Sequence, residues 1–278
     1  MIVETNYPLK NITTIGLGGY CKEYICPNNL IDFNYFYNKK NILYIGNGSN
    51  TCFLTDYYDG SIISLKRMKK HISHDKDYIL CSGNISCNKF VRYLHNNKIS
   101  GFEYLYGIPG TIGGSIFMNA GAYDEEILSH IHSIDLLDFE GKTFTLFQKD
   151  LNYSYRTSNL EKNLLVLSVK FSNYAKKFDK DLLQHLNTKR KTSQPTNKLS
   201  CGCIFKNPPN KFASQLIQNA GLKGMRVGGI YVSKKHSNYF INDGTGTHND
   251  FIDLLIKVKN EILLKYNVEL KEEVILVK

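Results

Sequence analysis

The sequence predicts an α+β protein with two lobes, in which short strands dominate the first part and helices the second. Length is the first reason, because 278 residues exceed what a single hydrophobic core usually organises. The second reason is the pattern of apolar residues, which changes from short runs broken by glycine to helical spacing near residue 178. Strands and helices do not alternate regularly, so a repeated βαβ architecture is not expected.

The first hundred residues predict short β-strands and one helix. Phe90, Val91 and Leu94 recur at helical spacing. Ile99 fits this spacing less well, and Gly101 follows where the helix would end. Apolar runs bounded by Gly, Asn or Asp predict strands at residues 42–45, 62–65 and 78–81.

A β-hairpin and a further strand are predicted next. Residues 134–139 and 143–147 are rich in apolar side chains and flank the turn Glu140-Gly141. Residues 164–171 form another apolar run, and the lobe boundary follows it.

Helices and one closing strand are predicted in the second lobe. Thr247 and Asp250 are spaced as a capping box, with Asp in place of the usual Glu or Gln. A single apolar stripe follows on a long helix: Phe251, Leu254, Leu255, Val258 and Ile262. Two shorter helices are predicted at residues 181–189 and 213–219, and a last strand at residues 274–277.

Composition is that of a soluble globular enzyme. Hydrophobic residues make up 42% and charged residues 22%, which excludes a wholly disordered or collagen-like chain. No apolar run approaches the roughly 18–20 residues that span a bilayer, and Met1–Glu4 lacks the start of a secretory signal. The 7 cysteines show no paired Cys-x-x-Cys spacing, so we expect reduced thiols and no bound metal in a cytosolic protein.

The charge favours an anionic partner. A net charge of +10 fits nucleic acid, phosphorylated metabolites and membrane surfaces equally well. Its distribution says more, because the stretch from Lys189 to Lys235 contains ten Lys or Arg residues and no acid, although the chain holds 25 acidic residues. Some of these cations must face solvent or an anionic ligand.

Two glycine-rich loops together predict a site for a diphosphate-bearing cofactor. The run Gly46-Asn47-Gly48-Ser49-Asn50 follows a predicted strand, but it is neither a P-loop nor a Rossmann fingerprint. Residues 107–114 hold four glycines in eight positions and are stiffened by Pro109, and residues 118–123 add further small side chains. Small residues let the backbone approach a flat or phosphorylated ligand. A tight turn would explain either loop alone, whereas a cofactor explains both.

Three further segments carry reactive side chains. Tyr155-Arg156 follows the hairpin, and residues 202–208 set a thiol, an ammonium group and an amide within one turn-rich segment. Glu272-Glu273 precedes the last strand. Taken singly, these are most simply a surface arginine, a small buried cysteine and a solvated glutamate.

In this order, the motifs resemble the UDP-N-acetylenolpyruvoylglucosamine reductase family of flavoenzymes, in its compact class. The resemblance covers nearly the whole chain, in segments 11–19, 46–50, 107–123, 155–156, 194–195, 202–208, 221–229, 236–242 and 273–274. It implies an FAD-binding lobe of the p-cresol methylhydroxylase (PCMH) type in two subdomains, followed by an α/β substrate-binding domain. These parts would span residues 1–66, 67–178 and 179–278.

The resemblance also implies a reaction and site residues. The enzyme would use NADPH to reduce UDP-N-acetylglucosamine enolpyruvate to UDP-N-acetylmuramate, for peptidoglycan synthesis. Arg156 and Glu273 would stabilise the enolate, and Tyr155, Lys206 and Asn207 would contact the nucleotide sugar. The FAD-binding residues would be Gly46, Asn47, Gly48, Ser49, Asn50, Gly107, Ile108, Pro109, Gly110, Thr111, Gly113, Gly114, Asn119, Ala120 and Gly121.

The sequence departs from the family at the proton donor. Cys203 stands where the family usually has the serine that protonates the carbanion. A thiol, with a reference pKa of about 8.5, is a stronger acid than an alcohol, so we expect Cys203 to serve. Lys271, Ile230, Ser237 and Tyr239 are milder departures that affect local packing.

Two other functions fit part of the sequence. Another flavoprotein of the same fold, such as a sugar or lactone oxidase, would share the first lobe alone. A basic nucleic-acid-binding protein would explain the charge and the tyrosines, but not the glycine loops. We therefore expect neither a nucleic acid nor a membrane partner, and a monomer in the bacterial cytoplasm.

Overall fold

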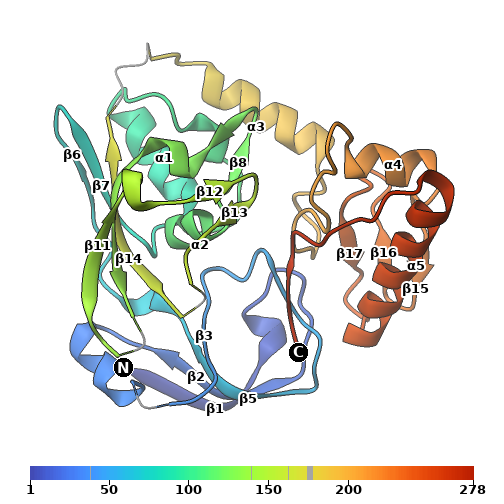
Figure 1. Cartoon of the computed structure of the whole chain (residues 1–278), viewed down its shortest axis with the longest axis horizontal. Coiled ribbons are helices and arrows are strands. Elements are labelled where there is room, and N and C mark those ends of the chain that lie inside the picture. The colour runs from blue at the N-terminus through green and yellow to red at the C-terminus, as the bar shows by residue number, and fades with distance from the viewer. Residues whose placement is uncertain (38, 139, 162, 174–177) are drawn as a thin grey trace. The chain divides into compact units, whose positions relative to one another are not determined.

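The computed structural model describes residues 1–37, 39–138, 140–161, 163–173 and 178–278 (Figure 1). The chain divides into two compact units, each made of several segments. Unit 1 comprises Met1–Thr5, Glu23–Asn47 and Gly60–Lys189. Unit 2 comprises Asn6–Lys22, Gly48–Asp59 and Arg190–Lys278.

The largest sheet lies in unit 1 and has five antiparallel strands in the order β11-β10-β14-β7-β6. The strands are β6 (Ile72–His74), β7 (Tyr78–Ser82), β10 (Ile131–Leu137), β11 (Thr143–Phe147) and β14 (Leu165–Ser172). The predicted hairpin is confirmed as β10 and β11, with Leu137 opposite Thr143. Phe139, which the prediction included, lies outside the described residues.

Helix α1 (Cys87–Asn96) covers one face of this sheet (Figure 1). Phe90, Val91 and Leu94 are buried, as their spacing predicts, and they pack with the apolar faces of β7, β10 and β14. The helix begins at its cap Ser86, whose hydroxyl accepts from the Lys89 amide at 3.3 Å. It ends before Gly101, because the chain already turns after Asn96.

The second glycine-rich segment is predicted to be a loop throughout, but part of it forms a helix. Residues Ile112–Phe117 form the short helix α2, which packs against β14 in the same core (Figure 1). Thr111 caps it by accepting the Gly114 amide at 3.2 Å. Gly113 therefore serves helix packing, since a Cβ there would lie 3.1 Å from the Gly83 carbonyl oxygen.

A four-stranded sheet has the order β1-β2-β5-β3. Its strands are β1 (Ile2–Pro8), β2 (Tyr20–Cys26), β5 (Tyr57–Ile63) and β3 (Ile42–Tyr44). The predicted strand at 62–65 therefore begins earlier and ends at Ile63, before a 3-10 turn at Leu65–Arg67. Strand β3 pairs in parallel with β5, and the first glycine-rich loop follows the end of β3.

Several small elements complete unit 1. Two short hairpins are formed by β8 (Gly121–Ala122) with β9 (Glu125–Glu126), and by β12 (Tyr153–Ser154) with β13 (Thr157–Ser158). Helix α3 (Leu182–Ser193) is longer than the predicted 181–189 and carries the chain from unit 1 to unit 2. Short 3-10 helices of unit 1 occur at Leu30–Tyr35, Leu65–Arg67, Glu103–Leu105, Ile127–His130 and Gln148–Asp150, and another, Leu9–Asn11, belongs to unit 2.

Unit 2 packs two helices with two small sheets. Its helices are α4 (Ala213–Asn219), as predicted, and α5 (His248–Tyr266). A three-stranded sheet contains β15 (Arg226–Val227), β16 (Ile230–Val232) and β17 (Phe240–Asn242). The predicted last strand is β18 (Ile275–Val277), which pairs in parallel with β4 (Thr51–Phe53).

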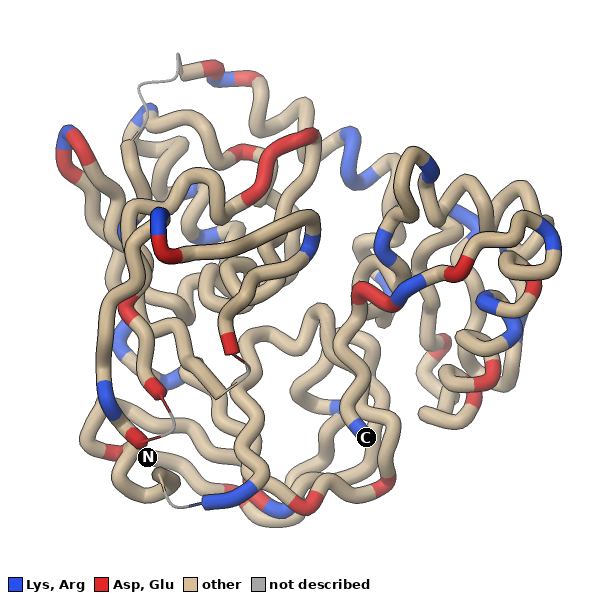
Figure 2. The backbone as a smooth tube through the Cα atoms, in the orientation of Figure 1, with Lys and Arg blue, Asp and Glu red and all other residues tan. Residues whose placement is uncertain are grey.

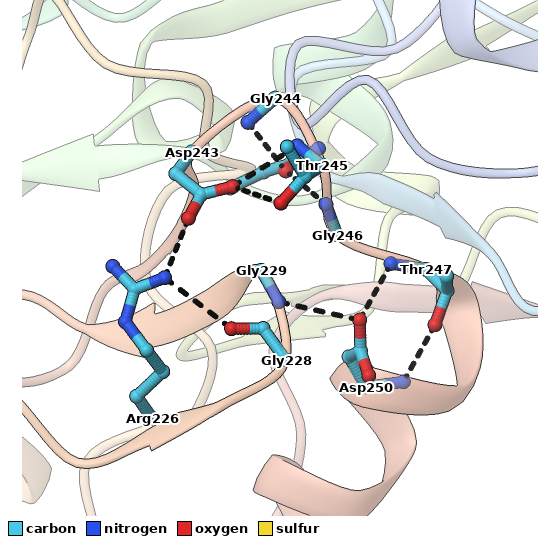
Figure 3. Close-up of polar contacts among 10 residues, drawn as sticks. Arg226, Gly228, Gly229, Asp243, Gly244, Thr245, Gly246, Thr247 and Asp250 are labelled. Atoms are coloured by element: carbon cyan, nitrogen blue, oxygen red, sulfur yellow. Dashed lines mark hydrogen bonds and ion pairs between the residues drawn. The ribbon is translucent and has the colours of Figure 1, made fainter.

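The capping box of α5 is confirmed (Figure 3). The Thr247 hydroxyl accepts the Asp250 amide at 3.1 Å, and the Asp250 carboxylate accepts the Thr247 amide at 2.9 Å. The predicted apolar stripe is buried in the core of unit 2. Aspartate thus replaces the usual longer acid without loss of the reciprocal contact.

The seven cysteines all carry free thiols, and all except Cys203 are buried. Over the described ranges, no helix combines the length and the apolar character needed to cross a membrane.

Candidate functional site

The start of the first glycine-rich loop, Gly46-Asn47, lies against the second loop within unit 1. The Asn47 side-chain amide donates to the Pro109 carbonyl oxygen at 2.9 Å. A Cβ on Gly46 would lie only 2.7 Å from Thr111 Oγ1, so this contact needs glycine. The two loops predicted to act together are therefore in direct contact, through the Asn47 side chain and the close approach of Gly46 to the Thr111 side chain.

The second loop is fixed from within unit 1. Gly107 has a left-handed φ of 84°, and its amide donates to Asn88 Oδ1 at 2.6 Å. The Gly110 carbonyl oxygen accepts the Cys87 amide at the start of α1. Ile108 packs against the core, so the loop is held at both ends and in the middle.

Arg156 occupies a conformation that favours glycine. It lies in the two-residue turn between β12 and β13 with φ 53°. Its Nη2 donates to the Gly121 carbonyl oxygen at 2.6 Å, and its guanidinium lies 4.7 Å from the Tyr155 ring centroid. A left-handed arginine costs backbone energy, which these side-chain contacts offset.

Asn119 acts through other protein groups. It is fully buried, has φ 44°, and its Oδ1 accepts the Leu128 amide at 3.2 Å. Its Nδ2 donates to Glu126 Oε2 at 2.8 Å and to the Ser154 carbonyl oxygen at 2.9 Å. Both ends of the amide are therefore engaged, and the side chain braces the hairpin that carries Arg156.

The other end of the first loop belongs to unit 2. Gly48 has φ 61°, and a Cβ there would lie 1.9 Å from the Ile12 carbonyl oxygen. Asn50 Nδ2 donates to the Glu273 carbonyl oxygen at 3.1 Å, while the Asn50 carbonyl oxygen accepts the Ile275 amide at 2.9 Å. The start of β18 is thus tied to the segment Gly48–Asn50.

Cys203 and Glu273 lie on neighbouring backbone segments of unit 2. Cys203 forms an antiparallel bridge with Tyr239, and the next residue, Ile204, accepts the Glu273 amide at 2.8 Å. Buried Asn238 clamps the first segment, because its side chain both accepts the Phe205 amide at 3.0 Å and donates to the Phe205 carbonyl oxygen at 2.8 Å. The thiol is therefore carried on a well-anchored backbone.

The two cysteines of this segment differ in their surroundings. Burial raises the pKa of the Cys201 thiol to about 12, whereas Cys203 is only partly buried. Burial also raises the pKa of Tyr239 far above its ordinary value, and negative charge on Cys203 would raise it further, whereas Arg190 lowers it. Tyr239 thus remains a neutral phenol close to Cys203 and Glu273.

The remaining predicted residues are placed with more ordinary contacts. The Lys206 amide donates to the Lys271 carbonyl oxygen at 2.9 Å. Asn207 Oδ1 accepts the Ala213 amide at 3.1 Å and so supports the start of α4. Over Lys189–Lys235 the backbone tube carries Lys and Arg but no Asp or Glu (Figure 2).

Sequence reasoning missed Glu126, Tyr239 and Arg190 as members of these surroundings. Glu126 follows two other residues of a tight acidic turn, where a solvated carboxylate is the ordinary expectation. The available signal was its position three residues after Tyr123, in a segment where the chain turns back on itself.

The fold and the loops define a flavin-dependent enzyme, because residues 33–146 match the family model of an FAD binding domain. Residues 194–277 match the model described as "UDP-N-acetylenolpyruvoylglucosamine reductase, C-terminal domain". The chain belongs to the UDP-N-acetylenolpyruvoylglucosamine reductase family.

Relatives match along the whole chain. The reductase of Fusobacterium nucleatum subsp. nucleatum is 33% identical and covers 100% of both chains. That of Staphylococcus haemolyticus is 35% identical, over 98% of this chain and 91% of its own. The crystal structure of the Thermus caldophilus reductase superposes with a TM-score of 0.84 at 27% identity, covering 100% of both chains.

These matches confirm the predicted family, the α+β fold class with its FAD-binding lobe of the PCMH type, and an FAD-dependent reductase. The sugar or lactone oxidase alternative rested on the first lobe alone, whereas the match extends through the C-terminal domain. The nucleic-acid-binding alternative gains no support from these relatives.

Proposed function

We propose that the enzyme reduces the enolpyruvyl ether of UDP-N-acetylglucosamine enolpyruvate with electrons from NADPH, and that Cys203 supplies the proton. The observation that carries the proposal is the arrangement in unit 2, where the Glu273 amide donates to Ile204 at 2.8 Å, one residue after Cys203. A proton donor and a carboxyl group are thereby held on adjacent segments beside Gly48–Asn50.

The cofactor would be held by the glycine-rich loops. Glycine at positions 46 and 48 lets the first loop pack closely on Thr111 and on the Ile12 carbonyl oxygen, where a Cβ would collide. Peptide groups of both loops and of Ala120-Gly121 would then face the diphosphate and the ring system. When bound, FAD supplies the hydride that NADPH first delivers to it.

Arg156 and Glu273 would stabilise the charge that develops on the substrate. Hydride addition to the vinyl carbon leaves an enolate conjugated with the substrate carboxylate, so fixed positive charge and hydrogen-bond donors at its oxygens lower the barrier. Arg156 offers a guanidinium already anchored on Gly121. Glu273 would serve as a hydrogen-bond donor in its protonated form.

Cys203 would protonate the adjacent carbon. The reaction needs one proton there, and a thiol with a reference pKa of about 8.5 releases it more readily than an alcohol. Cys203 is the partly exposed cysteine of this chain, whereas Cys201 is fully buried and its thiol pKa is raised to about 12. Donation leaves a thiolate beside the neutral phenol of Tyr239.

The substrate would be a nucleotide sugar with a diphosphate and a carboxylate. Lys206, Asn207 and Tyr155 are the residues that we expect to contact it, and the acid-free stretch Lys189–Lys235 suits its charge. The division into 1–66, 67–178 and 179–278, a monomeric state and a cytoplasmic location belong to the same proposal.

A half-reaction experiment tests this function. NADPH should bleach the flavin absorbance of the anaerobic holoenzyme, and UDP-N-acetylglucosamine enolpyruvate should restore it with formation of UDP-N-acetylmuramate. A sugar or lactone oxidase would instead be bleached by its sugar and restored by oxygen. Failure of the enolpyruvyl substrate to restore the absorbance would overturn the assignment.

A further inference from the structure

The Glu126 carboxylate lies in unit 1 between the brace Asn119 and the guanidinium of Arg156. We propose that Glu126 is a positioning residue that sets the orientation of Arg156 for enolate stabilisation, an inference that rests on the proposed function. Its place in the acidic turn Asp124-Glu125-Glu126 does not by itself suggest such a role.

The two carboxylate oxygens of Glu126 have different partners. Oε2 accepts the Asn119 side-chain amide at 2.8 Å, and Oε1 lies 3.6 Å from Arg156 Nη1. Arg156 Nη2 meanwhile donates to the Gly121 carbonyl oxygen at 2.6 Å. Both terminal nitrogens of the guanidinium thus contact one hairpin, formed by β8 and β9, in which Gly121 and Glu126 are directly paired. A planar fork fixed at two nitrogens has a defined orientation.

The same brace holds the backbone of Arg156. Asn119 Nδ2 donates also to the Ser154 carbonyl oxygen at 2.9 Å, in the strand that leads into the Arg156 turn. On the other strand of this hairpin, β13, the Ser158 hydroxyl donates to the Phe117 carbonyl oxygen at 2.6 Å. The fully buried side-chain amide of Asn119 therefore holds both the Glu126 carboxylate and the strand that leads into the Arg156 turn.

Backbone strain gathers around this arrangement. Asn119, Tyr123, Asp124 and Arg156 all have left-handed φ values, between 44° and 64°. Non-glycine residues adopt this region at an energetic cost, and such residues persist where surrounding contacts overdetermine them. If residue 156 served only to form a turn, glycine would adopt this conformation without strain. The strained arginine therefore indicates that its side chain is needed at this position.

Burial makes the ion pair effective. The side chains of Arg156 and Glu126 are 16% and 27% exposed, so solvent screens their interaction less than it would on an open surface. Removing the carboxylate charge weakens one of the contacts that orient the guanidinium, beside those to the Gly121 carbonyl oxygen and the Tyr155 ring, and so gives it more rotational freedom. A displacement of about 1 Å at a group that stabilises a transition state can cost about a hundredfold in rate.

Glu126→Gln in the full holoenzyme tests the proposal, because it removes the charge while keeping the length and an acceptor for Asn119. We expect the rate of flavin reoxidation by the enolpyruvyl substrate to fall by about tenfold to a hundredfold. Flavin reduction by NADPH should change by less than about twofold, because the enolate does not form in that step. Glu125→Gln is the matched control, since the same substitution one residue away affects the contact of Glu125 Oε2 with His130 Nε2 at 2.9 Å and should leave both rates within about twofold.

A double-mutant cycle distinguishes positioning from a general structural role. In an Arg156→Lys background, which lacks the planar fork, Glu126→Gln should reduce reoxidation by less than about threefold. An equal loss in both backgrounds, a parallel loss of NADPH reduction, or a faster reoxidation would each overturn the proposal. If Glu126→Gln proves unstable to heat, Glu126→Asp should show the same coupling in milder form.

Product binding supplies a readout that is independent of turnover. The carboxylate of UDP-N-acetylmuramate should bind Glu126→Gln more weakly, by about threefold to tenfold, in a flavin absorbance titration. Unchanged affinity would contradict the role. These outcomes are separate from failure of the proposed function itself, in which the unsubstituted enzyme would show no reoxidation by the enolpyruvyl substrate.

Discussion

The residues predicted to act on the enolate are supported differently in the two units. In unit 1, Arg156 is held by side chains and charge, through Gly121, Glu126 and Asn119. In unit 2, Cys203 is held by backbone pairing, through its bridge to Tyr239. A cation that stabilises the enolate needs a fixed guanidinium, whereas an acid that gives up a proton needs an anchored backbone.

The ion pairs of the two units also differ in whether they involve a predicted site residue. Unit 2 has its own cluster, in which Arg226 donates to Asp243 at 2.5 Å and to the Gly228 carbonyl oxygen at 3.3 Å (Figure 3). This cluster joins the turns at β15 and β17 and contains no predicted site residue. The ion pair between Arg156 and Glu126 therefore involves a predicted site residue in unit 1, whereas the pair between Arg226 and Asp243 in unit 2 connects turns of the fold.

The largest expected effect follows from Cys203→Ala. Removing the thiol removes the proposed acid, so reoxidation of the reduced flavin by the enolpyruvyl substrate should fall by about a thousandfold. Reduction by NADPH should persist, because it needs no proton from this residue. Stopped-flow absorbance measures both half-reactions separately.

Cys203→Ser is the matched variant for this prediction, because it places a hydroxyl where this chain has the thiol. It should retain activity and lose sensitivity to thiol-oxidising agents. Cys201→Ser probes the buried neighbour, which we expect to affect stability rather than proton transfer. Full turnover by Cys203→Ala would remove Cys203 from the mechanism.

The next effect compares one glycine from each unit. A Cβ at Gly121 would lie 2.1 Å from the Glu125 carbonyl oxygen, so Gly121→Ala should open the β8–β9 hairpin. We expect a loss of about 3 kcal/mol in the free energy of unfolding. Because Gly121 and Glu126 anchor the guanidinium, substrate-dependent reoxidation should also fall by about tenfold or more.

Gly202→Ala is the counterpart in unit 2. The nearest atom to its Cβ would be the Ser49 carbonyl oxygen at 3.8 Å, so only the left-handed φ of 78° opposes it. The expected cost is about 1 kcal/mol. Urea denaturation of both variants measures the difference, and equal costs would mean that close contact is not what constrains Gly121.

The strands, helices and glycine loops could be predicted because their signals are local. Apolar spacing placed α1, α5 and β10, and the glycines of both loops stood out in the sequence. Helix α2 was missed because Gly113 and Gly114 have low helix propensity. Capping by Thr111 and packing on β14 outweigh this low propensity here.

The support of Arg156 could not be predicted in the same way. Glu126 accepts a hydrogen bond from Asn119 and forms an ion pair with Arg156, which lies in a separate hairpin, so the contact with Arg156 is tertiary. Asn119 was predicted as a cofactor residue from its motif, and the structure places its amide among protein groups. The same limit applies to Tyr239, whose partner Cys203 is distant in sequence.

The smallest expected effect concerns the charged cluster of unit 2. Hydrogen bonds from Arg226 and then Thr245 lower the pKa of the Asp243 carboxyl from 3.8 to about 2. A lowered folded-state pKa stabilises the fold above the unfolded-state value, and this contribution is lost as the pH falls from about 4 through about 2. Asp243→Asn should therefore lower the urea midpoint slightly at pH 7, and the difference from the unsubstituted enzyme should shrink below about pH 4. Arg226→Gln should remove most of this pH dependence, while flavin reoxidation by substrate stays within about twofold in both variants. A midpoint difference that persisted unchanged in acid, or a large loss of turnover, would show that the cluster serves more than the fold.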